Sequence, residues 1–337
     1  MPAANTHPAL STTLAGIPLR NPVMLAAGCA GTLDELSQVL DLSRVGALVT
    51  KSITPLPREG NAPWRVAPVD AGMLNAVGLA NPGLDAFLRD YAPRIPAMPL
   101  PIIVSVAGFS VDDYVQVCAG VDALNATKEV VPAVELNVSC PNVKAGCEFA
   151  FDTALLSDLI REVRRVLPRT RLFVKLSPIA TGKVTMTDIA RAACEPANSP
   201  PTGPNNKPGA DALCVANTTP AMGVDVHTRK PLLGRVTGGF SGPGVHPMAV
   251  KLVHDVYRSF AKDANVPIVG IGGVMHWEHA AEFILAGASA IEMGTALYAD
   301  PRSPLGVIKG LEKWTRGQNA SIPQLVGQVD LTDAQTR

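Results

Sequence analysis

Hydrophobic positions along the chain fall into short apolar runs that alternate with longer amphipathic stretches. The short runs have the length and composition of buried β-strands. Strands are expected at Val23–Leu25, Ala47–Lys51, Ile102–Val106, Val134–Val138, Leu172–Leu176, Leu213–Ala216, Ile268–Ile271 and Ala290–Met293. The amphipathic stretches repeat apolar residues at helical spacing. Helices are expected at Leu33–Leu42, Leu84–Ile95, Asp112–Leu124, Thr153–Leu167, Thr187–Cys194, Pro247–Ala261, Trp277–Ala286 and Leu305–Thr315.

One helical stretch follows each strand, and this alternation predicts a parallel sheet covered by helices. Eight such units within about 300 residues fit a closed (β/α)8 TIM barrel better than an open doubly wound sheet. We therefore expect an α/β protein in which residues 1–337 form a single barrel domain, with its core between about 14 and 315. Residues 195–209 are rich in proline, glycine and asparagine, which predicts an exposed loop insertion without chemistry.

Composition narrows the class of protein further. The chain is 47% hydrophobic and carries 29 basic and 29 acidic residues. The apolar content excludes a disordered chain, and the balanced charge gives no reason to expect nucleic acid or an anionic membrane as partner. The apolar runs are too short to span a bilayer, and the N-terminus lacks the pattern of a signal peptide. A cytoplasmic protein is expected.

The chain has six cysteines, and no two of them have the C-x-x-C spacing of a zinc, iron–sulfur or thioredoxin-type site. Without a signal peptide, a disulfide framework is not expected either. Most of these thiols are therefore interpreted as small buried hydrophobic groups, and no metal site is predicted.

Glycines follow the last two expected strands. Gly272 and Gly273 close the seventh strand, and Gly294 with Thr295 closes the eighth. Backbone N–H groups next to glycine can approach an anion closely, and barrel phosphate sites lie after strands seven and eight. Tight turns alone are the alternative explanation, but the presence of both pairs at these two strands favours phosphate binding. Neither pair matches G-x-G-x-x-G, so a Rossmann-type NAD site is not predicted.

Two lysines stand at the carboxyl ends of expected strands, Lys51 after the second and Lys175 after the fifth. A lysine in a barrel mouth is costly unless it meets an anion or an electron-rich ligand. Each could instead reach solvent or pair with a carboxylate from elsewhere. The carboxyl ends of the strands form one rim of the barrel. Two lysines on this rim beside a phosphate site favour a bound cofactor whose reduced form is anionic.

Amides gather at the same rim. Side-chain amides offer donors and an acceptor, which suits a ring with carbonyl groups, N–H groups and a carboxylate. Turn formation is the alternative for asparagine. That alternative is adequate for Asn142, which follows a proline, and poor for Asn137, which lies inside an apolar strand. The residues concerned are Asn75, Asn137, Asn142 and Asn217.

Cys140 begins the long loop after the fourth strand. An inert buried thiol is the commoner fate of cysteine, but the start of a loop on this rim is not a core position. No catalytic His, Asp or Glu is near it in sequence, which favours proton abstraction from carbon over acyl transfer. A distant His227 or His246 stays open as a partner, and Cys147 is a rival thiol in the same loop.

Several motifs occur in order along nearly the whole chain, from about Leu14 to Leu311. They are "TKSITPLPREGN", "GMLNAVGLANPG", "ELNVSCPNVKAG", "VKLSP", "ANTTPAMG", "TGGFSGPG", "GIGGV" and "MGTALY". Together they resemble the dihydroorotate dehydrogenase family. The resemblance implies a TIM barrel that binds FMN at the carboxyl ends of its strands and oxidises (S)-dihydroorotate to orotate in de novo pyrimidine (UMP) biosynthesis.

The resemblance also implies roles for individual residues. Cys140 would be the base that takes the C5 proton, while hydride leaves C6 for the flavin N5. Substrate would be held by Lys51, Asn75, Gly78, Leu79, Asn137, Asn142, Asn217 and Thr218. FMN would be held by Ala27, Lys51, Ser52, Ser105, Asn137, Lys175, Gly242, Gly272, Gly273, Gly294 and Thr295.

The motifs also bear on the branch of the family. Cysteine at position 140, without an N-terminal membrane helix, resembles class 1 rather than the quinone-using, membrane-associated members. "GMLNAVGLANPG", "NVKAGCEFAF" and "SGPGVHPMAV" resemble the NAD-linked 1B catalytic subunit, whose partner subunit carries FAD and a [2Fe-2S] cluster. "TKSIT" and Ser105 instead resemble the fumarate-using, homodimeric 1A branch. A homodimer is expected, or a heterotetramer with an electron-transfer subunit.

Two further functions stay open. A dihydropyrimidine dehydrogenase-like enzyme shares "N-x-S-C-P", although Asn142 after Pro141 favours dihydroorotate. The other is a flavin-free barrel that acts as a binding or scaffold protein, which a colourless purified protein would indicate.

Overall fold

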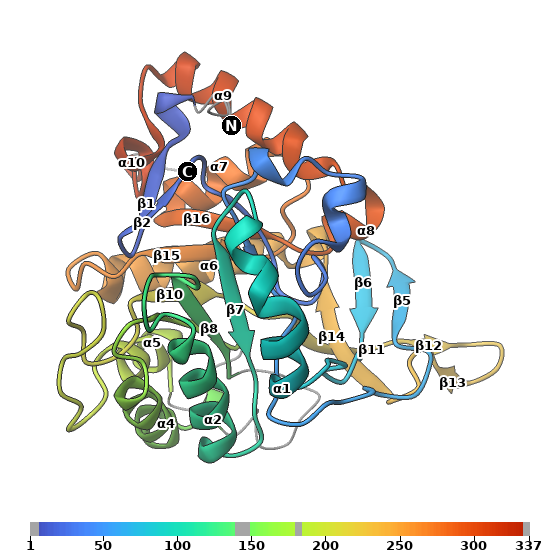
Figure 1. The fold of residues 1–337 in the computed structure, drawn as a ribbon. Helices are drawn as coiled ribbons and strands as arrows, with labels where there is room; N and C mark the ends of the chain where they lie inside the picture. The colour runs from blue at the N-terminus through green and yellow to red at the C-terminus, as the bar shows by residue number, and fades with distance from the viewer. Residues whose placement is uncertain (1–6, 139–148, 179–183, 333–337) are drawn as a thin grey trace.

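Eight short apolar strands pair side by side and close into a parallel barrel (Figure 1). The computed structural model describes residues 7–138, 149–178 and 184–332. The barrel closes where β16 pairs in parallel with β3. In chain order its strands are β3 (Val23–Leu25), β4 (Ala47–Val49), β7 (Ile102–Val106), β8 (Ala133–Asn137), β9 (Arg171–Lys175), β10 (Ala212–Val215), β15 (Ile268–Ile271) and β16 (Ala288–Met293). The predicted (β/α)8 fold is confirmed.

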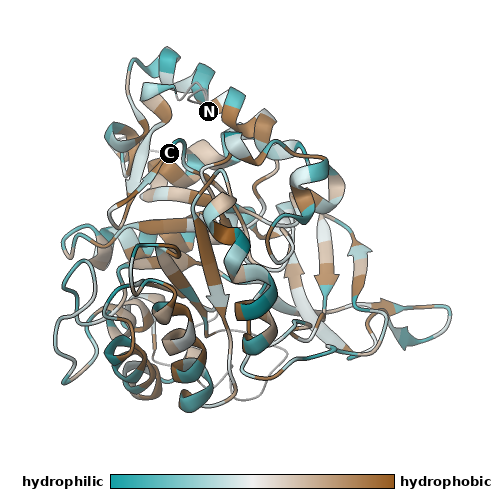
Figure 2. Ribbon diagram, viewed as in Figure 1, coloured by the Kyte–Doolittle hydropathy of each residue, from teal (hydrophilic) through white to brown (hydrophobic). Residues whose placement is uncertain are grey.

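Helices surround the barrel, with hydrophilic residues on their outer faces and the apolar strands inside (Figure 2). Side-chain caps begin several of them: Ser110 Oγ accepts from the Asp113 N–H at the start of α2, and Thr185 and Asp188 form a capping box at α5. The longer helices are α2 (Val111–Ala123), α4 (Thr153–Arg165), α5 (Met186–Cys194), α6 (His246–Val256), α7 (Trp277–Ala286) and α9 (Ser303–Gln318). Short ones are α1 (Leu84–Ala86), α8 (Ala296–Ala299) and α10 (Ile322–Leu325).

The prediction of a helix at Leu33–Leu42 is wrong. This segment forms two 3-10 turns instead, η2 (Glu35–Gln38) and η3 (Leu42–Arg44). The Glu35 carboxylate accepts hydrogen bonds from the Thr32 and Leu33 N–H groups, both at 2.8 Å. Asp41 in turn accepts from the Ser43 N–H at 3.0 Å. These local side-chain bonds satisfy the backbone without a regular helix.

The helix expected at Leu84–Ile95 is helical throughout but irregular. After α1 the chain forms a short π-helix, η4 (Phe87–Tyr91), and then a 3-10 helix, η5 (Ala92–Ala97). Pro93 and Pro96 lie in the 3-10 part. Because proline has no N–H to donate, a regular α-helix cannot pass through this segment.

A hairpin closes the amino end of the barrel. It consists of β1 (Thr12–Leu14) and β2 (Ile17–Leu19), and it follows the 3-10 turn η1 (Pro8–Leu10). Leu14, Ile17 and Leu19 are buried and pack on the inward-facing residues of the barrel strands. The 195–209 insertion lies at this same end, because Asn205 Nδ2 donates to the Ala15 carbonyl at 2.9 Å.

A second sheet lies beside the carboxyl ends of the strands, at the right of Figure 1. It joins β6 (Gly72–Asn75) and β5 (Val66–Val69), from the loop after β4, to β11 (Thr219–Met222) and β14 (Thr237–Ser241), from the loop after β10. The small hairpin of β12 (Val224–Asp225) and β13 (Lys230–Pro231) extends from it, and η6 (Pro243–Val245) and η7 (Tyr257–Ala261) flank α6. Among the described helices, none has both the length and the apolar character that a bilayer span needs.

Candidate active site

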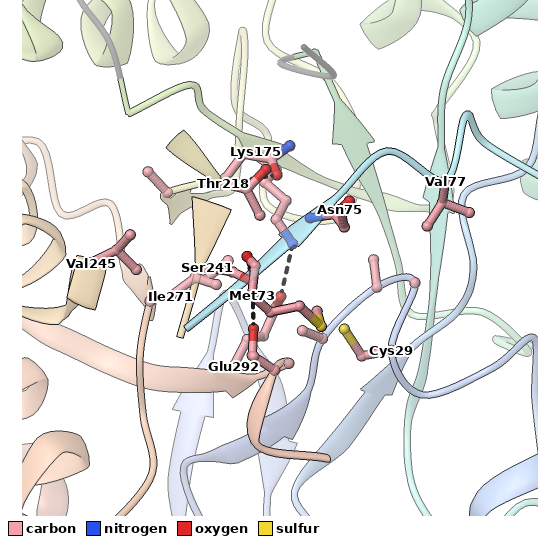
Figure 3. A pocket seen from close by; sticks show the side chains of 18 of the residues that line it. Cys29, Met73, Asn75, Val77, Lys175, Thr218, Ser241, Val245, Ile271 and Glu292 are labelled. Carbon is pink, nitrogen blue, oxygen red and sulfur yellow. Dashed lines mark hydrogen bonds and ion pairs between the residues drawn. The ribbon is translucent and has the colours of Figure 1, made fainter. Parts of the chain in front are cut away.

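One cavity opens at the carboxyl end of the barrel, where loops from most strands converge (Figure 3). This is the end at which barrels of this class carry their active sites. Its lining includes most of the residues singled out from the sequence: Ala27, Lys51, Ser52, Asn75, Gly78, Leu79, Asn137, Lys175, Asn217, Thr218, Gly272, Gly273, Gly294 and Thr295. The residues come from opposite sides of the barrel and from the second sheet.

A chain of hydrogen bonds fixes the polar side chains across the floor of the cavity. Asn217 Nδ2 donates to Asn137 Oδ1 at 3.0 Å, and Asn137 Nδ2 donates to Ser52 Oγ at 3.3 Å. Ser52 Oγ lies 2.8 Å from Ser105 Oγ. Each amide is therefore held in one orientation by a neighbour, so it can present its remaining groups to a ligand without reorganising.

The second sheet and its connecting loop supply the roof. Asn75 Nδ2 donates to the Gly239 carbonyl at 3.2 Å, which ties β6 to β14. Gly78 and Leu79 have φ of 78° and 59°, and the Leu79 carbonyl accepts from Asn81 Nδ2 at 2.8 Å. This left-handed pair bends the backbone against the cavity, so these two residues can contribute backbone groups to it.

The glycine loops after β15 and β16 are tightly packed. Gly273 has φ of 67°, and a Cβ there would lie 2.6 Å from the Gly242 carbonyl oxygen. His246 Nδ1 is hydrogen-bonded to the Gly272 carbonyl at 2.9 Å, and Thr295 Oγ1 donates to Ser241 Oγ at 2.8 Å. The turn at Gly273 is held so close to Gly242 that only glycine fits there, which suits an anion cradle.

Lys175 pairs with two carboxylates from other strands. Its Nζ lies 3.2 Å from Glu292 Oε2 and 3.5 Å from Glu135 Oε1, and all three side chains are almost completely buried. Burial alone would lower the pKa of Lys175, but the two carboxylates outweigh it and raise that pKa. Carboxylate pairing, the alternative considered for this lysine, therefore holds, while the lysine still lines the cavity (Figure 3).

Lys51 differs from Lys175. It lines the cavity and makes no ion pair with the described residues. Its backbone N–H donates to the Gly31 carbonyl at 2.9 Å, which fixes the chain at the end of β4. A charged group held here is available to an anionic or electron-rich ligand.

Among the described residues, two that the sequence predicted, Ser105 and Gly242, are not part of the lining. Ser105 is fully buried behind Ser52, and Gly242 lies behind Gly273. Cys140 and Asn142 lie outside the described residues, as does the rival thiol Cys147. His246 faces Glu282, with Nε2 3.1 Å from its carboxylate, and His227 is exposed on the β12–β13 hairpin.

The sequence analysis missed several cavity residues. Glu292 lines the cavity from β16, and Cys29, Met73, Phe240 and Tyr298 also contribute. Glu292 carries a signal that could have revealed it, because a charged residue interrupts the apolar run of its strand. Met73 and Phe240 carry none, since they belong to the second sheet, which was not expected.

Comparison with known proteins then decides the family. The family model described as dihydroorotate dehydrogenase matches residues 9–314. The chain belongs to the dihydroorotate dehydrogenase family. The resemblance noted from the motifs is thereby confirmed, and the protein is an oxidoreductase of this family.

Individual relatives cover nearly the whole chain. A protein of Desulforudis audaxviator named dihydroorotate dehydrogenase B (NAD(+)), catalytic subunit, is 41% identical over 96% of this chain and 98% of its own length. A protein of Trichlorobacter lovleyi with the same name is 39% identical over 96% of this chain and 99% of its own. A protein of Aquifex aeolicus, provisionally named dihydroorotate dehydrogenase A (fumarate), is 38% identical over 94% and 97%. The chain is thus similar to members of both class 1 branches.

Proposed function

We propose that this dihydroorotate dehydrogenase uses FMN to oxidise (S)-dihydroorotate to orotate in pyrimidine biosynthesis. The observation that carries the proposal is the cavity at the carboxyl end of the barrel, which gathers three of the expected amides, both lysines and the glycine loops. Membership of the family gives independent support.

The residues of the cavity fit FMN. The glycine loops after β15 and β16 suit its phosphate, because a Cβ at Gly273 would occupy the closely packed turn. Lys51 and Lys175 suit the edge of the flavin ring that becomes negative on reduction. Ala27, Ser52, Asn137, Gly272, Gly294 and Thr295 complete the proposed cofactor site, with Ser105 and Gly242 supporting it from behind.

In this proposal bound FMN would supply the acceptor for the hydride that leaves C6 of dihydroorotate. Cys140 removes the proton from C5 as general base. Asn75, Asn137, Asn142 and Asn217 hold the carbonyl, N–H and carboxylate groups of the ring in place, together with Thr218, Lys51 and the backbone of Gly78 and Leu79. The hydrogen-bonded amides keep these positions before substrate arrives, which lowers the cost of orienting it.

We further propose that electrons pass to NAD through a second subunit with FAD and a [2Fe-2S] cluster, in a heterotetramer built on a homodimer of this chain. Two relatives named as NAD(+)-linked catalytic subunits support this. The sequence itself contains no G-x-G-x-x-G and no cysteine cluster. Direct reduction of fumarate is the second candidate, favoured by Ser105 and by the Aquifex aeolicus relative.

An acceptor panel tests both candidates. The purified, FMN-loaded protein is mixed anaerobically with dihydroorotate and with NAD, fumarate or a quinone, and orotate formation is measured. We expect bleaching of the flavin by dihydroorotate, with little turnover on NAD alone. Rapid NAD reduction without a partner would contradict the two-subunit proposal, and rapid fumarate reduction would place the chain in the other branch. Dihydrouracil in place of dihydroorotate tests the dihydropyrimidine alternative, which bleaching by dihydrouracil alone would support.

A further inference from the structure

Two carboxylates compete for one lysine beneath the cavity. Glu135 on β8 and Glu292 on β16 have side chains with 0% exposure, and Lys175 is the cation that both contact. The reactive atoms of Glu135, Glu292 and Cys214 all lie within 4.8 Å of one another. The groups are contributed by three different strands, β8, β10 and β16, that close around the barrel interior.

The oxygens of this cluster are poorly satisfied if both carboxylates are ionised. By geometry, neither oxygen of Glu135 accepts a hydrogen bond from the described residues, and neither does Glu292 Oε1. The Cys214 thiol faces Glu135 and is at most a weak donor to it. Native proteins rarely leave buried polar atoms without a partner. A proton on one carboxyl group supplies the missing donor, because it can bond to an oxygen of the other.

Charge balance leads to the same conclusion. Two buried carboxylates in contact with one ammonium leave a net negative charge, because Lys51, the other lysine of the cavity, makes no ion pair with the described residues; an uncompensated buried charge is expensive. Two carboxyl groups that share one site do not both ionise at neutral pH, since each charge opposes the other. With one proton between them, the Lys175 cluster becomes neutral.

We propose that Glu135 and Glu292 share a single proton at neutral pH and act as positioning residues for Lys175. The shared proton keeps the cluster at the cavity floor neutral, so that Lys175 attracts an anionic ligand instead of being overbalanced by two carboxylates. The inference concerns the chain's own side chains. It is therefore tested without reference to the proposed FMN chemistry, and the two can fail separately.

The other titratable groups that face the pair do not supply this proton. Burial raises the pKa of Cys214 well above its usual range, so its thiol stays neutral, and burial also raises that of Cys29 to about 11. Burial raises the pKa of Glu292, and the charge of Glu135 raises it further. Lys175 lowers it by less, so the pKa of Glu292 lies well above its usual range. Among the described residues that line the cavity, Lys175 and Lys51 are the cations.

Infrared spectroscopy of the purified protein tests the proposal directly. A protonated carboxyl group gives a carbonyl band that ionised carboxylates lack and that shifts in D₂O. We expect this band in the wild type at neutral pH, and its loss in both Glu292→Gln and Glu135→Gln, where the remaining carboxylate pairs with Lys175. Glu278→Gln, at an exposed position on α7, is the matched control and should keep the band.

Stability as a function of pH gives a second readout. The folded state holds a proton that the unfolded chain releases above about pH 4.3. Between pH 6 and 8, the unfolding equilibrium constant of the wild type should therefore gain an extra factor of ten for each pH unit. Neither Gln variant should show this extra factor. Absence of the band from the wild type overturns the proposal even if the variants fail to fold. Equal pH dependence in the wild type and both folded variants overturns it as well.

Discussion

Glu135 and Asn137 stand two positions apart on β8 and therefore point to the same face of the strand. One meets Lys175 in the barrel interior, and the other joins the amide chain at the cavity floor. The sequence predicts the role of Asn137, because an amide inside an apolar run is conspicuous. It cannot reveal the partners of Lys175, since Glu292 lies 117 positions away and only the closed barrel brings the two together.

Replacement of the proposed base tests the assignment of Cys140. Cys140→Ala should retain FMN and bind orotate but slow flavin reduction by about 10²–10⁴-fold, the usual contribution of a positioned base. In the wild type the rate should rise with pH, because the thiolate is the competent form. Stopped-flow absorbance measures both effects. Cys147→Ala is the control and should react at a near-normal rate; the reverse order would mean that the wrong thiol was chosen.

Cys29 should be unreactive although it lines the cavity. Burial raises its pKa to about 11, and Lys175 and Lys51 only partly offset this, so the thiolate becomes abundant only as the pH approaches that value. Iodoacetamide labelling followed by mass spectrometry should leave Cys29 unmodified at pH 7.5 and modify it increasingly above pH 10. Cys118, which is fully buried, is the internal control. Rapid labelling of Cys29 at neutral pH would contradict this reasoning.

At the scale of helices and strands, the elements that can be predicted from the sequence are those that are deeply buried. The eight barrel strands are buried on both faces, and their continuous apolar runs reveal them. Leu33–Leu42 has apolar residues at helical spacing, but the Glu35 and Asp41 side chains each bind nearby backbone N–H groups, and a regular helix does not form. The sheet of β5, β6, β11 and β14 could not be predicted, because its strands pair across segments far apart in the chain.

The glycine turn after β15 should tolerate no side chain. In Gly273→Ala the added Cβ would meet the Gly242 carbonyl, and the φ of 67° disfavours any L-residue. We expect a loss of about 1–3 kcal/mol in the free energy of unfolding and a protein that purifies with little FMN. Urea unfolding and the ratio of flavin to protein absorbance measure the two.

Gly306→Ala is the matched control for this glycine. Gly306 lies within α9, and nothing is within 4 Å of its added Cβ. The same substitution there should keep FMN and leave stability equal or improved by up to about 1 kcal/mol. Full FMN content in folded Gly273→Ala would contradict the phosphate assignment of this loop.

At the scale of the whole molecule, the barrel separates two tasks between its ends. The carboxyl end holds the cavity, while the amino end is sealed by the β1–β2 hairpin and fastened by the insertion. Arg164 is central to that fastening. Its guanidinium contacts Asp211 at 2.9 Å and the Thr202 carbonyl of the insertion at 3.3 Å. Because contacts at the amino end stabilise the barrel, the loops at the carboxyl end can carry the functional residues.

This division predicts that Arg164→Met damages stability without altering the active site. Arg164 and Asp211 are both essentially unexposed, so the substitution leaves the Asp211 charge buried without its partner. We expect a loss of about 3–5 kcal/mol in the free energy of unfolding, measured by urea denaturation, with an unchanged KM for dihydroorotate wherever the variant is folded. Arg165→Met is the control, since its pair with Glu162 is largely exposed and contributes little. A raised KM with normal stability in Arg164→Met would show that the two ends are coupled.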